Sequence, residues 1–317
     1  MEKYEQVKDI GYGNYAAVKL IRNKETKAIF AVKYISRGHK VDERVAREII
    51  NHRTLGHPNI IQFKEVFLTP RNIAIVMEYA PSGDLFDYVC RHGKLNEHEA
   101  RFFFQQLVSG VSHCHDMEIC HRDLKLENTL LNGKLIKICD FGYSKSYLLH
   151  SRPKSMIGTP SYIAPEIFSR KEYDGKLADV WSCGVILYIM LVGEFPFGDQ
   201  KDLQNLKKIM NQIMLVQYKI PDTVHMSQDC RNLLSRIFVA NPMKRISMRE
   251  IKSHPWFLEN LPKEATKEDE DVNYIKENPI TCLQSIEEIM NIVDEAKAIP
   301  STSSLDQLED LVKAFKM

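Results

Sequence analysis

The chain has 317 residues, more than one ordinary domain of roughly 100–200 residues needs, and 44% of them are hydrophobic, enough for a sizeable core. Lysines and arginines number 43 against 42 aspartates and glutamates, which leaves a net charge of +1. This balance argues against a general binder of nucleic acid or of a membrane surface, because neither polyanion would be attracted overall.

Residues 4–79 are predicted to form a small sheet around one helix. Short β-prone runs occur at residues 7–10, 17–22, 29–35, 61–68 and 73–79, and residues 42–55 have a helical pattern between them. Residues 80–257 are predicted to be mostly helical, with long apolar-periodic stretches at 98–117, 177–193 and 228–239. The two stretches together indicate an α+β protein.

Residues 258–317 are predicted to be a separate C-terminal segment. Residues 258–283 form a charged linker punctuated by proline. A helix is expected at about residues 283–297, because Ser285 and Glu288 are typical of a capping box and five apolar residues share one helical stripe: Leu283, Ile286, Ile289, Met290 and Val293. A second short stripe covers residues 305–315. Isolated helices this short are marginal in water, so we expect the first one to dock on the main domain or on a partner.

The first chemical signal is a glycine-containing turn between the first two predicted strands. Gly11 and Gly13 lie in this turn, and Ala16 occupies the place of the third glycine of a Gly-x-Gly-x-x-Gly loop. Glycines let backbone amides approach a polyphosphate closely. The pattern is weak alone, and an ordinary hairpin turn would be the better explanation if nothing else followed.

A lysine inside an apolar strand is the second signal. Lys33 follows Ala31 and Val32 in a predicted strand, where its charge needs an anion to offset desolvation. The phosphates of ATP would supply one anion, and Glu48 in the following helix would supply another. Taken by itself, Lys33 could equally lie on a solvated strand face.

The stretch from His121 to Asn128, followed twelve residues later by Asp140-Phe141-Gly142, carries most of the chemical information. Phosphoryl transfer needs a carboxylate near the acceptor hydroxyl, oxygen ligands for a metal ion, and positive charge at the transferring phosphoryl group. Asp123 can orient the hydroxyl and accept its proton, and Lys125 can neutralise the γ-phosphate. Asn128 and Asp140 are hard oxygen donors suited to Mg²⁺.

At this point the sequence resembles the eukaryotic protein kinases over residues 4–257. The resemblance rests further on Ala164-Pro165-Glu166, on the stretch that begins at Asp179, and on Arg245. It implies a bilobal fold, with a β-rich N-lobe at residues 4–79 and a helical C-lobe at residues 80–257. It also implies ATP and Mg²⁺ as cofactors, with Mn²⁺ as a substitute. Glu166 would pair with Arg245, and Asp179 would anchor the catalytic loop from beneath.

The same resemblance implies a nucleotide pocket. Met77 would be the gatekeeper residue, and Glu78 to Ala80 would form the hinge to the adenine. The residues expected around ATP are Ile10, Gly11, Gly13, Val18, Ala31, Lys33, Met77, Glu78, Ala80 and Leu130.

Two features favour serine or threonine over tyrosine as the acceptor. The catalytic loop contains Lys125, and the stretch Gly158-Thr159-Pro160-Ser161-Tyr162 resembles a serine/threonine acceptor platform, in which Thr159 would bond to Asp123 and Lys125. Asp84 and Glu127 occupy positions that contact basic residues before the acceptor in basophilic kinases. We therefore expect a preference for arginine or lysine about three residues before the target, although an exposed acidic pair without this role is the alternative.

A finer resemblance is to the plant sucrose non-fermenting-1-related kinases of subclass 2. The matching stretches are residues 47–53, 100–106, 119–129, 140–146, 150–155 and, most tellingly, the tail at 284–290. The resemblance implies osmotic-stress and abscisic acid signalling and restraint by type 2C protein phosphatases. It also implies activation through Ser155, and secondarily Ser151, because phosphate near arginine side chains would order the loop. An upstream activating kinase would be a further partner.

His52 departs from the common kinase pattern, because an apolar residue usually stands one turn after the helix glutamate. We expect from this departure a helix that needs support from the tail stripe at residues 286–293. Two alternative functions remain: a nucleotide-binding pseudokinase scaffold, which predicts damage at the catalytic residues, and a calcium-regulated kinase relative, which predicts an EF-hand loop or a basic calmodulin-binding helix after residue 260.

The expected location is the cytoplasm and the nucleus. None of the seven cysteines forms a Cys-x-x-Cys pair, and the first ten residues contain no apolar signal core. The longest apolar run, residues 185–192, is far shorter than the roughly 20 residues that span a bilayer. We therefore expect reduced thiols, protein substrates as partners, and neither a membrane nor a nucleic acid.

Overall fold

The computed structural model describes residues 3–12, 16–146, 158–169, 171–198, 205–261 and 282–298. The chain divides into two compact units. The first, the sheet unit, contains Met1–Ala46, Lys64–Tyr79 and Cys282–Met317, and the second, the helical unit, contains Arg47–Phe63 and Ala80–Thr281. The helix α1 (Glu43–Thr54) therefore begins in the sheet unit and ends in the helical unit, and the tail groups with the sheet.

The sheet unit is built on five strands in the order β1-β2-β3-β5-β4. Their bounds are Tyr4–Tyr12, Ala16–Asn23, Ile29–Ser36, Phe63–Leu68 and Asn72–Glu78 for β1 to β5. The pairs β1–β2, β2–β3 and β3–β5 are antiparallel. In this register Lys33 lies opposite Val18 on one side and Ile75 on the other, and Ala31 lies opposite Met77. Val32 on β3 is fully buried, whereas the next side chain, Lys33, is only partly buried.

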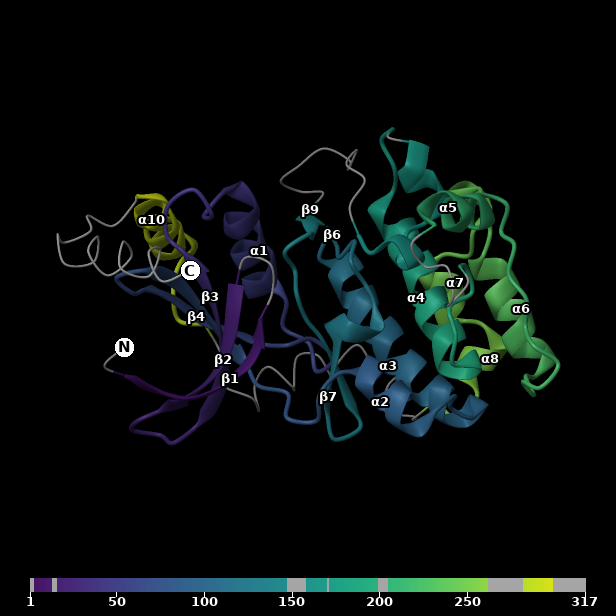
Figure 1. Cartoon of the computed structure of the whole chain (residues 1–317), viewed down its shortest axis with the longest axis horizontal. Helices are drawn as coiled ribbons and strands as arrows, with labels where there is room; N and C mark the ends of the chain where they lie inside the picture. The colour runs from purple at the N-terminus through teal and green to yellow at the C-terminus, as the bar shows by residue number, and fades with distance from the viewer. Residues whose placement is uncertain are drawn as a thin grey trace, which may run out of the picture. The chain divides into compact units, whose positions relative to one another are not determined.

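The tail helix α10 (Ile286–Lys297) lies beside this sheet and contacts β5 (Figure 1). Ser285 and Glu288 form the expected capping box. Ile289 and Val293 are fully buried, as the stripe predicted, whereas Leu283 is 93% and Ile286 49% exposed. The predicted stripe is therefore wrong at Leu283, which precedes the helix, and at Ile286, whose side chain in the first turn is exposed.

Polar contacts hold both ends of α10. Before its first turn, the side chain of Gln284 accepts from the backbone N–H of Val66 and donates to the carbonyl of Val66, both at 2.8 Å. At its last turn, Arg37 donates to the carbonyl of Glu295 at 3.0 Å, and the N–H of Gly38 donates to Ala296 at 2.8 Å. These bonds satisfy carbonyls that a helix end leaves without partners, and they cover an edge strand. The second tail stripe at residues 305–315 lies outside the described residues.

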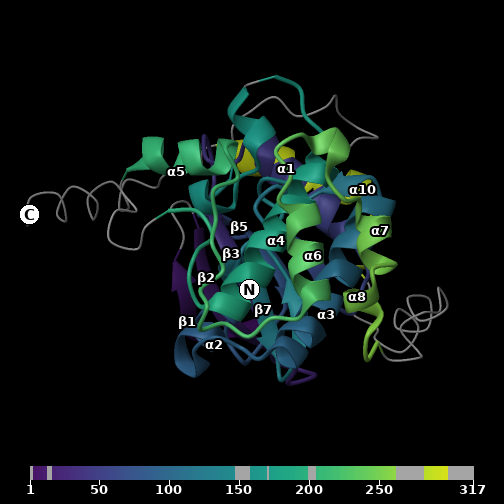
Figure 2. The same cartoon turned by 90° about the vertical axis from the view of Figure 1, so that its right-hand side faces the viewer.

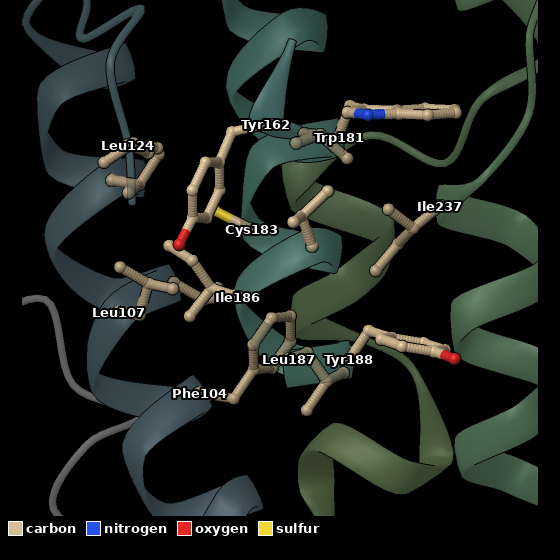
Figure 3. Close-up of a cluster of buried hydrophobic side chains, with 14 of the residues drawn as sticks. Phe104, Leu107, Leu124, Tyr162, Trp181, Cys183, Ile186, Leu187, Tyr188 and Ile237 are labelled. Atoms are coloured by element: carbon tan, nitrogen blue, oxygen red, sulfur yellow. The ribbon is translucent and has the colours of Figure 1, made fainter. Parts of the chain in front are cut away.

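The helical unit is organised around α4 (Gly175–Val192), which packs against α3 (Glu97–Asp116) and α6 (Gln228–Ile237), shown beside it in Figure 2. Apolar side chains of these three helices point toward one another (Figure 3), among them Phe104, Leu107, Trp181, Cys183, Ile186, Leu187 and Ile237. α4 is also apolar and long enough to cross a membrane, with a mean hydropathy of 1.6. Because 83% of it is buried among these helices, its apolar character is that of a core helix.

The remaining elements of the helical unit are short. The helices are α2 (Leu85–His92), α5 (Leu206–Met214), α7 (Met248–Lys252) and α8 (Pro255–Leu258). The strands are paired as β6 (Ile119–Cys120) with β9 (Lys145–Ser146) and β7 (Thr129–Asn132) with β8 (Leu135–Ile138). Single 3-10 turns cover Leu126–Asn128, Pro160–Tyr162, Pro165–Ser169 and Pro242–Lys244. The expected α+β class, with a sheet-rich N-lobe and a helical C-lobe, is confirmed.

Candidate active site

The loop between β6 and β7 is anchored from below by a buried carboxylate. Asp179 of α4 is fully buried, and its two oxygens accept the backbone N–H groups of His121 and Arg122, both at 2.8 Å. The ring of His115 is also hydrogen-bonded to it, at 2.9 Å. Arg122 has a φ of 67°, a left-handed conformation that a residue with a side chain seldom adopts. The two hydrogen bonds that backbone N–H groups donate to Asp179 fix this turn, so that the next side chain, Asp123, has a defined position.

Asp123 is the centre of a small polar cluster. Its Oδ1 accepts from both the N–H and the hydroxyl of Thr159, each at 3.2 Å. Its Oδ2 lies 3.1 Å from the ammonium of Lys125 and 3.1 Å from the side-chain amide of Asn128. Lys125 also donates to the hydroxyl of Thr159 at 3.1 Å. The structure therefore brings together four of the residues that the sequence assigned to catalysis and metal binding.

The two expected metal ligands are linked through the backbone. The N–H of Cys139 donates to the carbonyl of Asn128 at 3.0 Å, which holds the residue before Asp140 against the catalytic loop. The side-chain N–H₂ of Asn128 is turned toward Asp123, so its amide oxygen is directed the other way. Asp140 is exposed, and its Oδ1 accepts from Gly142 at 3.3 Å.

An amide oxygen and a carboxylate fit a hard divalent cation that completes its shell with water and phosphate oxygens. Mg²⁺ suits such a set better than a soft metal would, because no sulfur or imidazole takes part. Among the described residues no group of three or more histidine, cysteine or acidic side chains could hold a metal ion.

The remaining nucleotide residues are divided between the two units. In the sheet unit, Val18, Ala31 and Met77 lie on the adjacent strands β2, β3 and β5, with Lys33 on β3, Glu78 at the end of β5, and Ile10 and Gly11 on β1. In the helical unit, Ala80 is buried, and Leu130 forms a β-bridge with Asp84. Gly13 lies outside the described residues. The nucleotide pocket as a whole stays a prediction.

Glu48 is 8% exposed and points at the Asp140-Phe141-Gly142 segment, because a Cβ on Gly142 would lie 3.3 Å from its Oε2. It belongs to the helical unit, whereas Lys33 belongs to the sheet unit. The expected pairing of these two side chains remains a prediction.

The stretch that follows the predicted acceptor platform is braced by the ion pair expected between Glu166 and Arg245. Arg245 donates to both carboxylate oxygens of Glu166, each at 2.7 Å, and to the carbonyl of Leu177, also at 2.7 Å. Its guanidinium lies 5.1 Å above the ring of Trp181, and its side chain is fully buried. Such a bidentate pair fixes both the distance and the plane of the two groups.

Tyr162 is a further site residue to which the sequence reasoning gave no role. Its hydroxyl is 3.3 Å from the carboxylate of Glu127, one of the two acidic residues expected to contact basic substrate residues. Burial, together with the charge of Glu127, raises the pKa of Tyr162 well above its usual range. The second acidic residue, Asp84, caps α2 by accepting from Asp87 at 2.8 Å. The only sequence signal for Tyr162 is that it lies in the stretch expected to form the acceptor platform.

A cluster of basic side chains lies beside the catalytic loop. Burial lowers the pKa of Lys145, and the nearby charges of Arg122 and Arg47 lower it further, whereas Glu172 acts in the opposite direction. The three cations therefore lie close enough to repel one another. Arg122 also donates to the carbonyl of Tyr143 at 2.7 Å. A bound anion would relieve this repulsion. Ser151 and Ser155, the expected phosphorylation sites, lie outside the described residues.

Comparison with known proteins agrees with this geometry. The family model of the protein kinase domain matches residues 4–257. The serine/threonine-protein kinase SAPK7 of Oryza sativa subsp. japonica is 64% identical over 309 residues, which cover 96% of this chain and 86% of the relative. The serine/threonine-protein kinase SRK2A of Arabidopsis thaliana is 64% identical, with 96% and 84% covered. A third, SRK2B of Arabidopsis thaliana, is 65% identical over 300 residues, with 94% and 83% covered.

Proposed function

Because this chain belongs to the protein kinase family, and within it to the plant sucrose non-fermenting-1-related kinases of subclass 2, we propose that Asp123, Lys125, Asn128 and Asp140 carry its transfer of phosphate from ATP to serine or threonine. The chain is a serine/threonine protein kinase that uses ATP and acts on protein substrates. The proposal concerns which residues do this, with which metal, and under which control.

The observation that carries the assignment is that both carboxylate oxygens of Asp123 have fixed partners. One oxygen is occupied by Thr159, and the other faces Lys125 and Asn128. A carboxylate held in this way can orient an acceptor hydroxyl and take its proton without rearranging. Lys125 lies close enough to neutralise charge on a phosphoryl group that approaches the same hydroxyl.

Asn128 and Asp140 would hold Mg²⁺, which when bound neutralises the phosphates and helps to place them for in-line transfer. Lys33 would bind the phosphates of ATP from β3, and Glu48 would orient Lys33. Both side chains are buried or half-buried, which suits a pair that acts away from bulk water. Mn²⁺, with similar oxygen chemistry, would substitute for Mg²⁺.

The decisive experiment compares phosphate transfer from Mg-ATP to a serine peptide by the wild type, Asp123→Asn and Asp140→Ala. Removal of the base is expected to lower kcat by about 10²–10⁴-fold. Asp116→Asn is the matched control, because Asp116 is an exposed aspartate at the end of α3. If Asp140→Ala transfers phosphate at the wild-type rate, the assignment of the site is wrong.

Regulation is proposed to act through the basic cluster of Arg122, Lys145 and Arg47. Phosphate on Ser155, or secondarily on Ser151, would add negative charge beside this cluster and order the activation segment. The phosphate would come from the kinase itself or from an upstream activating kinase, and type 2C protein phosphatases would remove it. Mapping phosphate by mass spectrometry before and after treatment with such a phosphatase tests this: activity that does not follow occupancy of Ser155 contradicts it.

The cellular setting is proposed from the family. The kinase would act in osmotic-stress and abscisic acid signalling, in the cytoplasm and the nucleus. A fluorescent fusion examined before and after osmotic stress tests the location, and kinase activity recovered from the same cells tests the pathway. Neither alternative function gains support: a pseudokinase predicts damage at Lys33, Asp123, Asn128 or Asp140, and all four are intact. The relatives are named serine/threonine-protein kinases, without mention of calcium.

A further inference from the structure

The second half of α1 contacts the Asp140-Phe141-Gly142 segment through polar side chains. We propose that Asn51 and Ser144 form a latch, a hydrogen-bonded link from α1 that positions Asp140 for metal binding. Both residues belong to the helical unit. The proposal rests on the proposed function, because it takes Asp140 as a metal ligand.

The latch is a hydrogen-bond relay. The side-chain amide of Asn51 donates to the hydroxyl of Ser144 at 2.9 Å, and this hydroxyl donates to the carbonyl of Phe141 at 2.7 Å. The backbone N–H of Ser144 reaches the same carbonyl at 2.9 Å. Asn51 is 2% and Ser144 4% exposed, so water does not replace these bonds at low cost. The relay ties α1 to the carbonyl directly after Asp140.

Beside the latch lies a stack of rings of the kind that protein kinases generally build on this phenylalanine, and His52 belongs to it. His52 is 4% exposed, and its Nε2 is 2.6 Å from the carbonyl of Ile61. A carbonyl only accepts, so this nitrogen carries a proton and the ring orientation is fixed. The ring stacks on Phe141, with centroids 5.1 Å apart and planes at 25°. The ring of His121 contacts Phe141 at 5.0 Å, so two oriented imidazoles hold one phenyl ring.

The segment needs such support because its backbone is unfavourable. Asp140 has a φ of 65°, in the left-handed region that residues with a side chain seldom occupy. Conformations of this kind persist only where the surroundings fix them. Cys139, the residue before Asp140, is held by two hydrogen bonds of 3.0 Å. Its N–H donates to the carbonyl of Asn128, and its carbonyl is bonded to the ring of His121. On the other side of Asp140, the latch fixes the carbonyl of Phe141 in the same way.

The direction of these bonds explains why polar residues are used. An apolar contact between α1 and Phe141 would survive a small slide of one past the other, whereas hydrogen bonds weaken steeply with misalignment. If the latch is weakened, Asp140 spends part of its time outside the metal-binding conformation. The apparent metal affinity then equals the intrinsic affinity multiplied by the fraction of molecules in the metal-binding conformation.

The test uses Ser144→Ala, Asn51→Leu and the double variant. Two quantities are measured: the Mg²⁺ concentration that gives half-maximal phosphorylation, and the binding of a non-hydrolysable ATP analogue by calorimetry with and without Mg²⁺. Ser144→Ala is expected to raise the half-saturating Mg²⁺ about tenfold and to leave metal-free nucleotide binding unchanged. The double variant is expected to be no worse than Ser144→Ala, because the bond between the two side chains is already lost.

Ser109→Ala is the matched control. Ser109 also shares a side-chain hydrogen bond between elements, with His57 at 3.2 Å, but it does not contact the Asp140 segment. It is expected to lower the melting temperature without changing the Mg²⁺ requirement.

Two outcomes would overturn the latch. One is an unchanged Mg²⁺ requirement in both Ser144→Ala and Asn51→Leu, with only the melting temperature lowered as in the control. The other is a weakening of nucleotide binding that is equal with and without Mg²⁺. If Ser144→Ala does not fold, Asn51→Leu decides alone, because it leaves the bond from Ser144 to Phe141 in place. A wild type that transfers no phosphate would instead refute the proposed function.

Discussion

Asp123 receives two hydrogen bonds from a single residue, Thr159, whose backbone N–H and hydroxyl both lie 3.2 Å from the same carboxylate oxygen. Thr159 belongs to the acceptor platform and Asp123 to the catalytic loop. The contact therefore couples the surface on which a substrate peptide would lie to the group that would take its proton.

This contact leads to the first prediction. Thr159→Ala removes the hydroxyl bond but keeps the backbone bond, so we expect kcat to fall by about tenfold, the equivalent of one hydrogen bond to a charged group. Thr159→Ser keeps the hydroxyl and should retain most of the activity. Steady-state phosphorylation of one peptide by both variants checks this, and equal losses in the two would show that the methyl group, not the hydroxyl, matters.

The second prediction concerns the ion pair between Arg245 and Glu166. Arg245→Ala would leave a carboxylate that is only 9% exposed without its partner, and this should cost about 3–5 kcal/mol of unfolding free energy. Arg236→Ala is the control, because its pair with Glu250 is 44% and 53% exposed and should contribute at most about 1 kcal/mol. Urea denaturation of both variants measures the difference, and similar losses would contradict the assigned role of burial.

The third prediction is a pH dependence of stability. Burial, together with the nearby charges of His113, Lys137 and Lys252, lowers the pKa of His57 from 6.5 to about 3. Its Nδ1 accepts from the N–H of Asn59 at 3.0 Å, which requires a neutral nitrogen. The unfolded chain therefore binds one more proton than the folded chain between pH 6.5 and about 3. The stability contributed by neutral His57 is complete above pH 6.5 and is lost as the pH falls through this window.

The midpoint of urea denaturation at pH 7, 6 and 5 measures this effect. The free energy of unfolding should decrease with falling pH by up to about 1.4 kcal/mol per pH unit from this residue alone. His57→Gln should be less stable at pH 7 but should show a shallower decrease. A variant whose stability falls as steeply as that of the wild type would exclude His57 as the source.

The fourth prediction concerns the tail helix α10. Val293 is fully buried, so Val293→Asp should detach the helix and lower both the melting temperature and the kinase activity. Leu283→Asp is the control, because Leu283 is 93% exposed and should tolerate the charge.

Deleting residues 281–317 should likewise lower activity without unfolding the catalytic domain. Full activity of the truncated protein would remove the regulatory role of the tail.

The fifth prediction concerns substrate choice. Tyr162→Phe removes the hydroxyl that lies 3.3 Å from Glu127 and should weaken the preference for an upstream basic residue about threefold, without changing kcat on a neutral peptide. Glu127→Gln should weaken the preference more strongly. A peptide array scored at each upstream position measures this, and a wild-type profile indifferent to basic residues would contradict the expected role of both acidic residues.

Most of the fold and the chemical core of the site could be predicted from the sequence. The strands, the long helices and α10 follow from local periodicity and capping residues, which depend on neighbours a few positions away. The predicted apolar stripe of α10 failed only at Leu283 and Ile286, because exposure depends on where the helix docks. Tyr162, Asn51 and Ser144 were missed as site residues, since each acts through a partner distant in the sequence.

The sequence by itself determined which chemical groups are available. Asp123, Lys125 and Asn128 lie in the motif at residues 121–128, and Asp140 begins the motif at residues 140–142. It also determined the order of the elements that carry them. Only the tertiary structure decided how each group is held: Asp179 lies 56 positions beyond Asp123 and Thr159 lies 36, yet both fix the catalytic loop. Hydrogen bonds and ring contacts depend on distance and direction in space, and long-range packing sets both of them.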